Sequence, residues 1–245
     1  YELFFEDAEV AATNLGIALT KRGKIGDKDI PMCGVPYHSA QTYLSRLIKQ
    51  GFKVAIAEQL GESEEESKSQ KIFKRDVVRI ITPGTIIEDS LLDSKNNNNL
   101  LSIFFHKGLI SIAWVDMTSG LIKLERIEGK NFLQYLTESI HKIEPGEIIV
   151  SEEIKNSKIL NEKLGVFDKQ ISYIPHTFYD HKNNTDVINN FFDIKKIQSL
   201  ADLNQADIAV IGALINYLKL TQKNNIPKIR NVEIVSREKF MQIDM

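Results

Sequence analysis

The chain has 245 residues, enough for one large domain or two of ordinary size, and its content of 42% hydrophobic and 26% charged residues is that of a globular protein. No apolar run reaches the roughly 18 residues of a membrane span, no signal-peptide pattern occurs, and the single cysteine, Cys33, excludes an internal disulfide and a thiolate metal cluster. With 31 Lys and Arg against 33 Asp and Glu, the net charge is −2, so composition alone does not indicate a nucleic-acid-binding protein.

The first 25 residues predict two short strands and a helix. Residues 1–4 indicate a strand, small apolar residues from Ala8 to Leu15 indicate a helix, and Gly16 ends it. A second strand is expected at residues 17–20, followed by a polar turn at 21–24. Because the first strand has no lead-in, we expect the chain to be a fragment or to continue upstream.

Residues 30–59 predict a rigid loop, a helix and a strand. Pro31 and Pro36 restrict the loop, and Gly34 permits a turn within it. A helix follows, with Ser39 placed to cap its start and Gly51 to end it. Its apolar stripe keeps steps of three and four residues and consists of Ala40, Tyr43, Leu44, Leu47 and Ile48. Residues 52–57 then indicate a strand lying against this helix.

The next segment leads to a domain boundary. Residues 61–74, rich in Glu, Ser and Lys, indicate a mobile surface segment, and residues 77–81 indicate a strand that ends in a turn at 82–85. Alternating strands and helices favour a small α/β layer domain. The boundary itself is expected at residues 88–99, because the Asn tract at 96–99 is turn-prone and too polar for a core.

A hairpin sheet is expected in the second half. Residues 101–105, 109–116 and 121–125 indicate consecutive strands joined by tight turns. Asn131 is expected to cap a helix, and residues 147–150 to form another strand.

The last hundred residues are less regular, with one clear helix. Short helices around Asn161 and Phe191 and a strand at 171–174 are expected first. Residues 205–222 then show a clear helical stripe, although Gly212 within it costs about 1 kcal/mol relative to Ala.

Several motifs carry a family resemblance that covers essentially the whole chain. YELFFEDA, ALTKRG, the stretch from Ile30 to Gln59 and RDVVRIITPGT, in this order, resemble the mismatch-recognition domain of the bacterial MutS DNA repair family. WVDMTSG and the closing IPKIRNVEIVSREKFMQIDM are similar to the segments that follow in that family, and the resemblance is looser from Asn96 to Asn225.

The resemblance implies an α/β chain with three parts. A small mixed-sheet α/β domain for mismatch recognition is expected at residues 1–90. A ribonuclease-H-like α/β connector domain is expected at 100–225, and the start of a core or lever domain at 226–245.

The resemblance also implies a first site residue, Glu2. In this family a Phe-x-Glu motif enters the mispaired site, where the Phe stacks on a base and the Glu hydrogen-bonds to it. Tyr1 and Glu2 match the last two positions, and the Phe would lie just before Tyr1. Because base stacking contributes roughly 1–3 kcal/mol, we expect the chain without this Phe to bind mismatches poorly. The alternative is that Glu2 is an ordinary exposed carboxylate.

The resemblance implies five further DNA contacts. Lys21, Arg22 and Arg75 are expected at phosphates, where they would position the protein without reading sequence. Pro31 and Met32 are expected beside the minor groove. The alternative for each basic residue is that its side chain is simply solvated.

The piece itself is expected to lack catalytic residues, metal ligands and cofactors. It contains no G-x-x-x-x-G-K-S/T loop, so ATP and Mg²⁺ are assigned to other regions of a complete family member. By resemblance the expected partners are double-stranded DNA with mismatches or small loops, a MutL-type repair protein at the connector, and a second copy in a dimer. The expected location is the bacterial cytoplasm, associated with the nucleoid and not with a membrane.

Two other functions are compatible with the sequence. In a ribonuclease-H-like metal-dependent nuclease, Asp116 would bind metal with partners drawn from Glu152, Glu153, Asp180 and Asp186. The other possibility is a protein-docking module without DNA affinity. Cys33 has no His and carboxylate pattern around it, and we expect it to be a packing residue.

Overall fold

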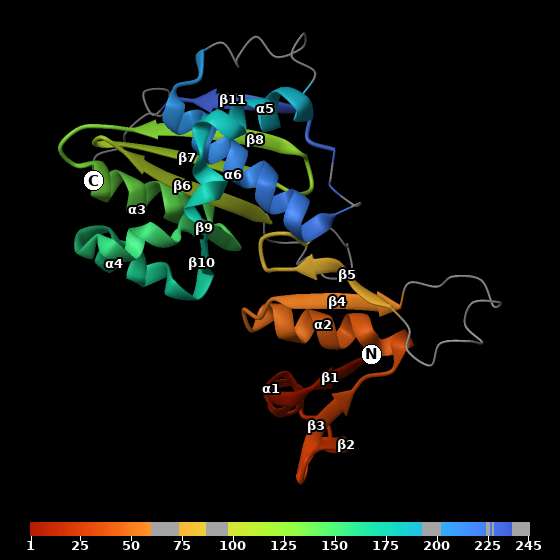
Figure 1. Cartoon of the computed structure of the whole chain (residues 1–245). Coiled ribbons are helices and arrows are strands. Elements are labelled where there is room, and N and C mark those ends of the chain that lie inside the picture. The colour runs from red at the N-terminus through yellow and green to blue at the C-terminus, as the bar shows by residue number, and fades with distance from the viewer. Residues whose placement is uncertain (60–73, 87–97, 193–201, 224–225, 227, 237–245) are drawn as a thin grey trace.

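The computed structural model describes residues 1–59, 74–86, 98–192, 202–223, 226 and 228–236. Figure 1 shows two parts. The first part holds a three-stranded sheet, a two-stranded sheet and helices α1 and α2, and the second part is built around a six-stranded sheet. The α/β class expected from the sequence is confirmed.

The first sheet has β3 (Lys28–Gly34) in the middle, with β1 (Glu2–Phe4) and β2 (Thr20–Ile25) antiparallel on either side. Helix α1 (Phe5–Leu15) follows β1 directly and packs its small residues around the buried Cys33 of β3. Gly16 then ends the helix in a left-handed conformation, with φ of 67°. Cys33 is therefore a packing residue, as expected, and burial raises the pKa of its thiol.

Three local predictions in this sheet are wrong. The strand expected at 17–20 and the turn expected at 21–24 are replaced by the strand Thr20–Ile25, and the turn falls at Gly26 and Asp27, where Gly26 has a φ of 60°. Residues 30–34, expected in a loop, complete β3. Pro31 stays paired with Lys21, although a proline cannot donate a backbone hydrogen bond, and the ladder shifts register between Lys21 and Lys24.

Helix α2 (Ala40–Lys49) follows a single 3-10 turn, η1 (Tyr37–Ser39), and leads into the hairpin of β4 (Val54–Gln59) and β5 (Arg75–Ile81). Gly51, with φ of 89°, lies just beyond the helix end and donates to the Ile48 carbonyl over 2.9 Å. Ser39 occupies the expected N-cap position but its side chain makes no cap hydrogen bond. Leu47 packs against α1 and β3, whereas Ile48 packs against the hairpin.

All but the last residue of the surface segment predicted at 61–74, and all but the last two residues of the boundary predicted at 88–99, lie outside the described residues. The end of the Asn tract corrects the sequence reading, because Asn98 and Asn99 are buried. Asn98 donates to the Ile86 carbonyl over 2.7 Å, and Asn99 donates to the Ile143 carbonyl over 2.8 Å. A buried amide side chain is stable when its polar atoms have hydrogen-bond partners in the core. The polarity of the residue alone does not predict whether such partners exist.

The second part has the ribonuclease-H-like sheet order that the resemblance implies. Three consecutive antiparallel strands, β6 (Asn99–His106), β7 (Leu109–Asp116) and β8 (Leu121–Ile127), are extended beside β6 by the parallel strands β9 (Glu147–Ser151) and β10 (Ile171–Ile174). β11 (Asn231–Val235) adds a parallel strand on the far side of β8.

Helices cover both faces of this sheet. One face carries α3 (Phe132–Ile143) and α4 (Lys158–Leu164), and the other carries α5 (His181–Phe191) and α6 (Gln205–Gln222) (Figure 1). Short 3-10 segments link them: η2 (Glu152–Asn156), η3 (Gly165–Gln170) and η4 (His176–Tyr179). Asn131 precedes α3 without a side-chain cap bond. Among the described residues, no helix is both long enough and apolar enough to cross a membrane.

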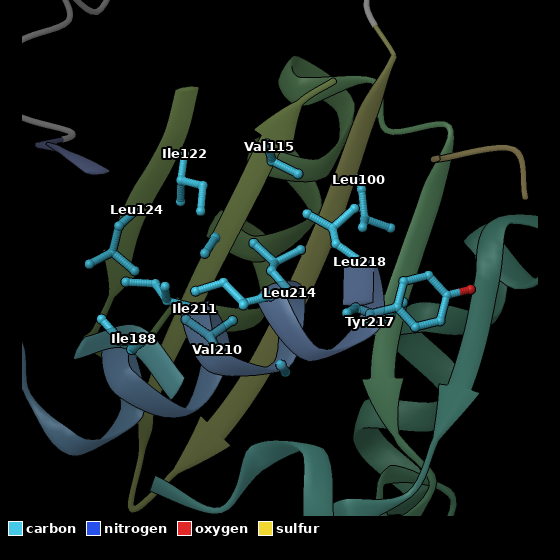
Figure 2. Packing of buried hydrophobic residues seen from close by; sticks show 14 of the residues in the cluster. Leu100, Val115, Ile122, Leu124, Ile188, Val210, Ile211, Leu214, Tyr217 and Leu218 are labelled. Atoms are coloured by element: carbon cyan, nitrogen blue, oxygen red, sulfur yellow. The ribbon is translucent and has the colours of Figure 1, made fainter. Parts of the chain in front are cut away.

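Helix α6 is the centre of the larger core and has the bounds that its apolar stripe predicted. Figure 2 shows Ile211, Leu214 and Leu218 of the helix against Leu100, Val115 and Leu124 of the sheet. Each such side chain contributes roughly 1.5–3 kcal/mol when fully buried. The helix begins with a capping box, in which Asn204 accepts from the Asp207 backbone and Asp207 accepts from that of Asn204.

The last described strand lies in this sheet, although the sequence assigned residues from 226 to the start of a further domain. Val232 of β11 is buried in the core around α6. Residues 237–245 lie outside the described part, and the boundaries at 1–90, 100–225 and 226–245 stay predictions.

A buried carboxylate, Glu147 at the start of β9, joins the two parts of the molecule. Lys53, just before β4, lies with its ammonium 3.2 Å from Glu147 Oε1, and the Gly84 amide donates to Oε2 over 3.3 Å. The hydroxyls of Thr82, Ser172 and Tyr217 also donate to this carboxylate, that of Tyr217 over 2.7 Å. We call these six residues the Glu147 clasp.

Candidate nucleic-acid interface

Strand alternation divides the predicted site residues between the two faces of the first sheet. Glu2 pairs with Gly34, and both Phe4 and Thr20 pair with Met32, so these residues share one face. Arg22 follows Thr20 by two residues and reaches the same face. We call the surface formed by Glu2, Thr20, Arg22 and Met32 the outer face, because α1 packs on the opposite side around Cys33.

An ion pair connects the two charged residues of the outer face. Arg22 Nη1 lies 2.5 Å from Oε1 and 2.6 Å from Oε2 of Glu2. The Arg22 side chain is 61% exposed and that of Glu2 is 45% exposed. Exposed pairs of this kind contribute about 0–1 kcal/mol to stability, so the pair is too weak to explain the fold and remains available to a ligand.

A bulge lies where Arg22 leaves β2. Lys21 pairs with Pro31 and Lys24 pairs with Asp29, so Arg22 and Gly23 together face the single residue Ile30. Gly23 has a φ of 80°, which suits the extra residue of such a bulge. Bulges redirect side chains, and here the Arg22 side chain extends across β3 to Glu2 on β1.

Lys21 and Pro31 do not join the outer face. They pair with each other one position away from Met32, so alternation directs them to the other side of the sheet. The Lys21 ammonium lies 2.7 Å from the Asp29 carboxylate, and this hydrogen bond raises the pKa of Lys21. Met32 is half-buried, with its sulfur 3.8 Å from the Thr20 hydroxyl.

Arg75 lies on a different element, the β4–β5 hairpin. It is exposed at the start of β5 and pairs with Gln59 of β4. The residue before Gln59 on β4, Glu58, accepts a hydrogen bond of 3.1 Å from the Tyr1 hydroxyl. The hairpin end that carries Arg75 is thereby tied to β1.

A cleft of about 500 Å³ opens between β1, α2 and the β4–β5 hairpin. Its walls are mostly apolar and include Tyr1, Leu3, Tyr37, Leu44 and Ile56. Tyr37 is 80% exposed and stacks on Tyr1 with ring centroids 5.8 Å apart. Sequence reasoning missed Tyr37, for which the only signal was an aromatic residue following Pro36 in a stretch interpreted as a loop.

Comparison with known proteins identifies the family. Residues 1–90 match the family model described as MutS domain I, and residues 98–230 match the one described as MutS domain II. The chain belongs to the MutS family.

Individual MutS proteins match along the whole chain. It is 39% identical over 246 residues to the DNA mismatch repair protein MutS of Ehrlichia chaffeensis, 39% over 250 residues to that of Rickettsia typhi, and 36% over 246 residues to that of Anaplasma phagocytophilum. Each match covers 100% of this chain but only 30%, 28% and 29% of the respective relative. The chain thus spans less than a third of the length of these MutS proteins.

The carboxylates of the nuclease interpretation do not converge in this MutS-family chain. Asp116 ends β7 opposite Asn99, beside the start of β9, whereas Glu152 and Glu153 follow the end of β9. Strand β9 is five residues long, so its two ends are roughly 16 Å apart, which is too far for ligands of one metal pair. Asp180 instead caps α5, accepting from the Lys182 amide over 3.0 Å.

A second cavity, of about 560 Å³, lies at the ends of β6 and β9 and contains several polar groups. His176 Nδ1 lies 3.2 Å from both the Ser151 hydroxyl and the Glu153 carboxylate. Within the described ranges, no group of three His, Cys, Asp or Glu side chains is arranged to hold a metal ion. Neither the comparisons nor this geometry supports the nuclease alternative.

Proposed function

We propose that this chain is the mismatch-recognition and connector portion of a DNA mismatch repair protein of the MutS family. Its first part would bind duplex DNA with mispaired bases or small loops, and its second part would couple that binding to regions of the complete protein beyond this chain. The proposed contacts on the outer face are Glu2 at the mispaired base, Arg22 at a phosphate and Met32 beside the minor groove, with Arg75 at a further phosphate. Lys21 at a phosphate and Pro31 beside the minor groove stay predictions, because both alternate to the other side of the sheet.

The observation that carries this proposal is the position of Glu2. It lies exposed on the outer face beside Arg22 and Met32, in the segment that matches MutS domain I. A carboxylate on a DNA-facing surface repels phosphates, so its presence there favours readout of a base edge, where it accepts or donates a hydrogen bond. Mispaired sites resist unstacking and bending less than paired ones, which adds to the discrimination.

The remaining functions of a complete MutS protein are proposed for other regions. ATP and Mg²⁺ would bind outside this chain, which has no phosphate-binding G-x-x-x-x-G-K-S/T loop, and this portion would not itself be an enzyme. Dimerisation would likewise involve the complete protein. A MutL-type repair protein is proposed to contact the connector part, and the bacterial cytoplasm is the proposed location.

The test compares the complete protein, which includes the aromatic residue expected just before Tyr1, with its Glu2→Ala variant. Affinities for a G·T-mismatched duplex and its matched counterpart are measured by fluorescence anisotropy. Loss of one hydrogen bond to a charged group costs about 1.5–3 kcal/mol, so the preference for the mismatch should fall about tenfold or more. Glu9→Ala, at an exposed position of α1, is the matched control and should keep the preference.

Two results would contradict the proposal. An unchanged preference in Glu2→Ala would remove Glu2 from the site. A complete protein that binds partner proteins but neither duplex would instead favour the docking module without DNA affinity.

A further inference from the structure

The guanidinium of Arg22 is only partly used by Glu2. Both short contacts come from Nη1, which reaches Oε1 over 2.5 Å and Oε2 over 2.6 Å. Within the described part of the chain, Nη2 and Nε of Arg22 have no hydrogen-bond partner. A guanidinium carries five N–H donors in a fixed plane, so three of them stay free while Nη1 holds the carboxylate.

The free donors match the geometry of one particular ligand group. Nη2 and Nε form a planar fork that fits two oxygens of a phosphate, and the Arg22 side chain is 61% exposed. Unlike the Lys21 ammonium, which is already paired with Asp29, this group can hold a carboxylate and a phosphate at the same time.

On DNA, the Arg22 guanidinium would offset repulsion between the Glu2 carboxylate and the phosphates. An ionised Glu2 brought against a duplex meets phosphates of the same sign, and within about 8–10 Å this repulsion is not screened by physiological salt. A guanidinium lying between the two anions offsets it. The bulge at Arg22 and Gly23 provides this position by directing the side chain across β3 toward Glu2.

We propose that Arg22 bridges Glu2 to a backbone phosphate next to the mispaired base, and so sets the orientation of the Glu2 carboxylate. The inference rests on the proposed function and adds to it. Arg22 is then a positioning residue for mismatch specificity, because a phosphate contact that alone carries no sequence information fixes the group that reads the base.

Arg22→Lys tests the bridge, because it keeps the positive charge but removes the fork. In the complete protein, Arg22→Lys should lower the preference for a G·T-mismatched over a matched duplex about tenfold, the loss expected for one charge-assisted hydrogen bond. Affinity for the matched duplex and the slope of affinity against salt should change little, since the charge is kept. Arg46→Lys, exposed on α2, is the matched control and should leave all three quantities unchanged.

A double-substitution cycle separates bridging from simple phosphate contact. If the bridge acts through Glu2, Arg22→Lys should cause no further loss of preference in a Glu2→Ala background. Equal weakening of both duplexes by Arg22→Lys, or an additive loss in the double variant, would overturn the bridge and leave Arg22 as an ordinary phosphate contact.

Failure of the bridge differs from failure of the proposed function. If the unaltered protein prefers the mismatch, Glu2→Ala abolishes the preference and Arg22→Lys keeps it, only the bridge is wrong. If the unaltered complete protein shows no mismatch preference, the proposed function is wrong and the bridge falls with it.

Discussion

At the scale of single residues, two tyrosines have phenols inside the second part of the molecule. Burial raises the pKa of Tyr179 far above its ordinary value near 10, and its hydroxyl donates to the Ile149 carbonyl over 3.0 Å. Burial, and then the neighbouring charge of Glu147, raise the pKa of Tyr217 in the same way. Both phenols therefore keep their protons in the folded chain at pH values where an unfolded chain releases them.

This difference predicts alkaline destabilisation. Below pH 10 the folded and unfolded chains carry the same tyrosine protons, so the contribution to stability is fully present. Above pH 10 the unfolded state binds fewer protons, and the free energy of unfolding should fall by up to about 1.4 kcal/mol per pH unit for each tyrosine. Urea unfolding between pH 9 and about 11.5 measures this slope.

Single substitutions assign the slope to its residues. Tyr179→Phe should reduce the slope of unfolding free energy against pH by the contribution of one proton, up to about 1.4 kcal/mol per pH unit. Tyr37→Phe, at an 80% exposed ring, should leave this slope unchanged. An equal slope in the unaltered chain and in both variants would show that Tyr179 titrates normally in the folded state.

At the scale of elements, Gly212 shows how helix packing reverses a helix-propensity argument. Propensity predicts that Gly212→Ala stabilises α6 by about 1 kcal/mol. In the structure, however, a Cβ at this position would lie 2.1 Å from Cγ and 2.4 Å from Cβ of Asn184 in α5. Asn184 is held there by hydrogen bonds to the carbonyls of Phe178, at 2.8 Å, and Ala209, at 3.3 Å.

Gly212→Ala should therefore destabilise the chain by roughly 1–3 kcal/mol, the usual cost of overpacking, when measured by urea unfolding at neutral pH. Gly165→Ala is the matched control, because this position has a φ of −56° and an added Cβ would meet no described atom within 4 Å. It should be neutral or stabilising by up to about 1 kcal/mol. A stabilised Gly212→Ala variant would mean that α5 and α6 separate without cost.

Sequence periodicity predicted the elements whose faces are clearly divided. The apolar stripe from Ile208 to Leu218 predicted α6. Apolar alternation and turn residues predicted the hairpin strands of the six-stranded sheet. The β2–β3 hairpin was missed because its exposed, charged residues carry no apolar alternation, and Pro31 favoured a loop. Only Gly26 at the turn offered a signal.

The same limit applies to the candidate site. The family resemblance selected Glu2 and Arg22, but only strand pairing separates them from Lys21 and Pro31, which alternate to the other side. The Glu2–Arg22 contact depends on a bulge and a three-strand register, and neither is visible in the spacing of residues along one chain.

At the scale of the whole molecule, the Glu147 clasp joins the first part to the six-stranded sheet. Glu147 is 1% exposed, and removing one partner of a buried charge is more costly than losing a surface pair. Lys53 is 43% exposed, so part of its attraction is already screened. We expect Lys53→Met to lower the free energy of unfolding of the first part by about 1–2 kcal/mol, and Glu147→Gln to lower that of the chain by more, up to about 3–5 kcal/mol.

The clasp also predicts which strands lose protection from amide hydrogen exchange. Amide hydrogen exchange in β5 should speed up in Lys53→Met, whereas exchange in β7 and β8 should not, because only the hairpin side loses its anchor. Lys49→Met, at an exposed position of α2, is the matched control and should leave both unchanged. Uniform acceleration throughout the chain would show that Lys53 supports global stability and not the junction.

Helix α2 contributes to two separate cores through neighbouring residues. Leu47 belongs to the cluster around α1 and Cys33, and Ile48 belongs to the cluster beneath the hairpin. A change of side-chain volume at Leu47 or Ile48 is expected to shift the axis of α2 and so to disturb the packing of the other core. Redesign of one core consequently requires compensating changes in the other, and the two cannot be optimised as independent modules.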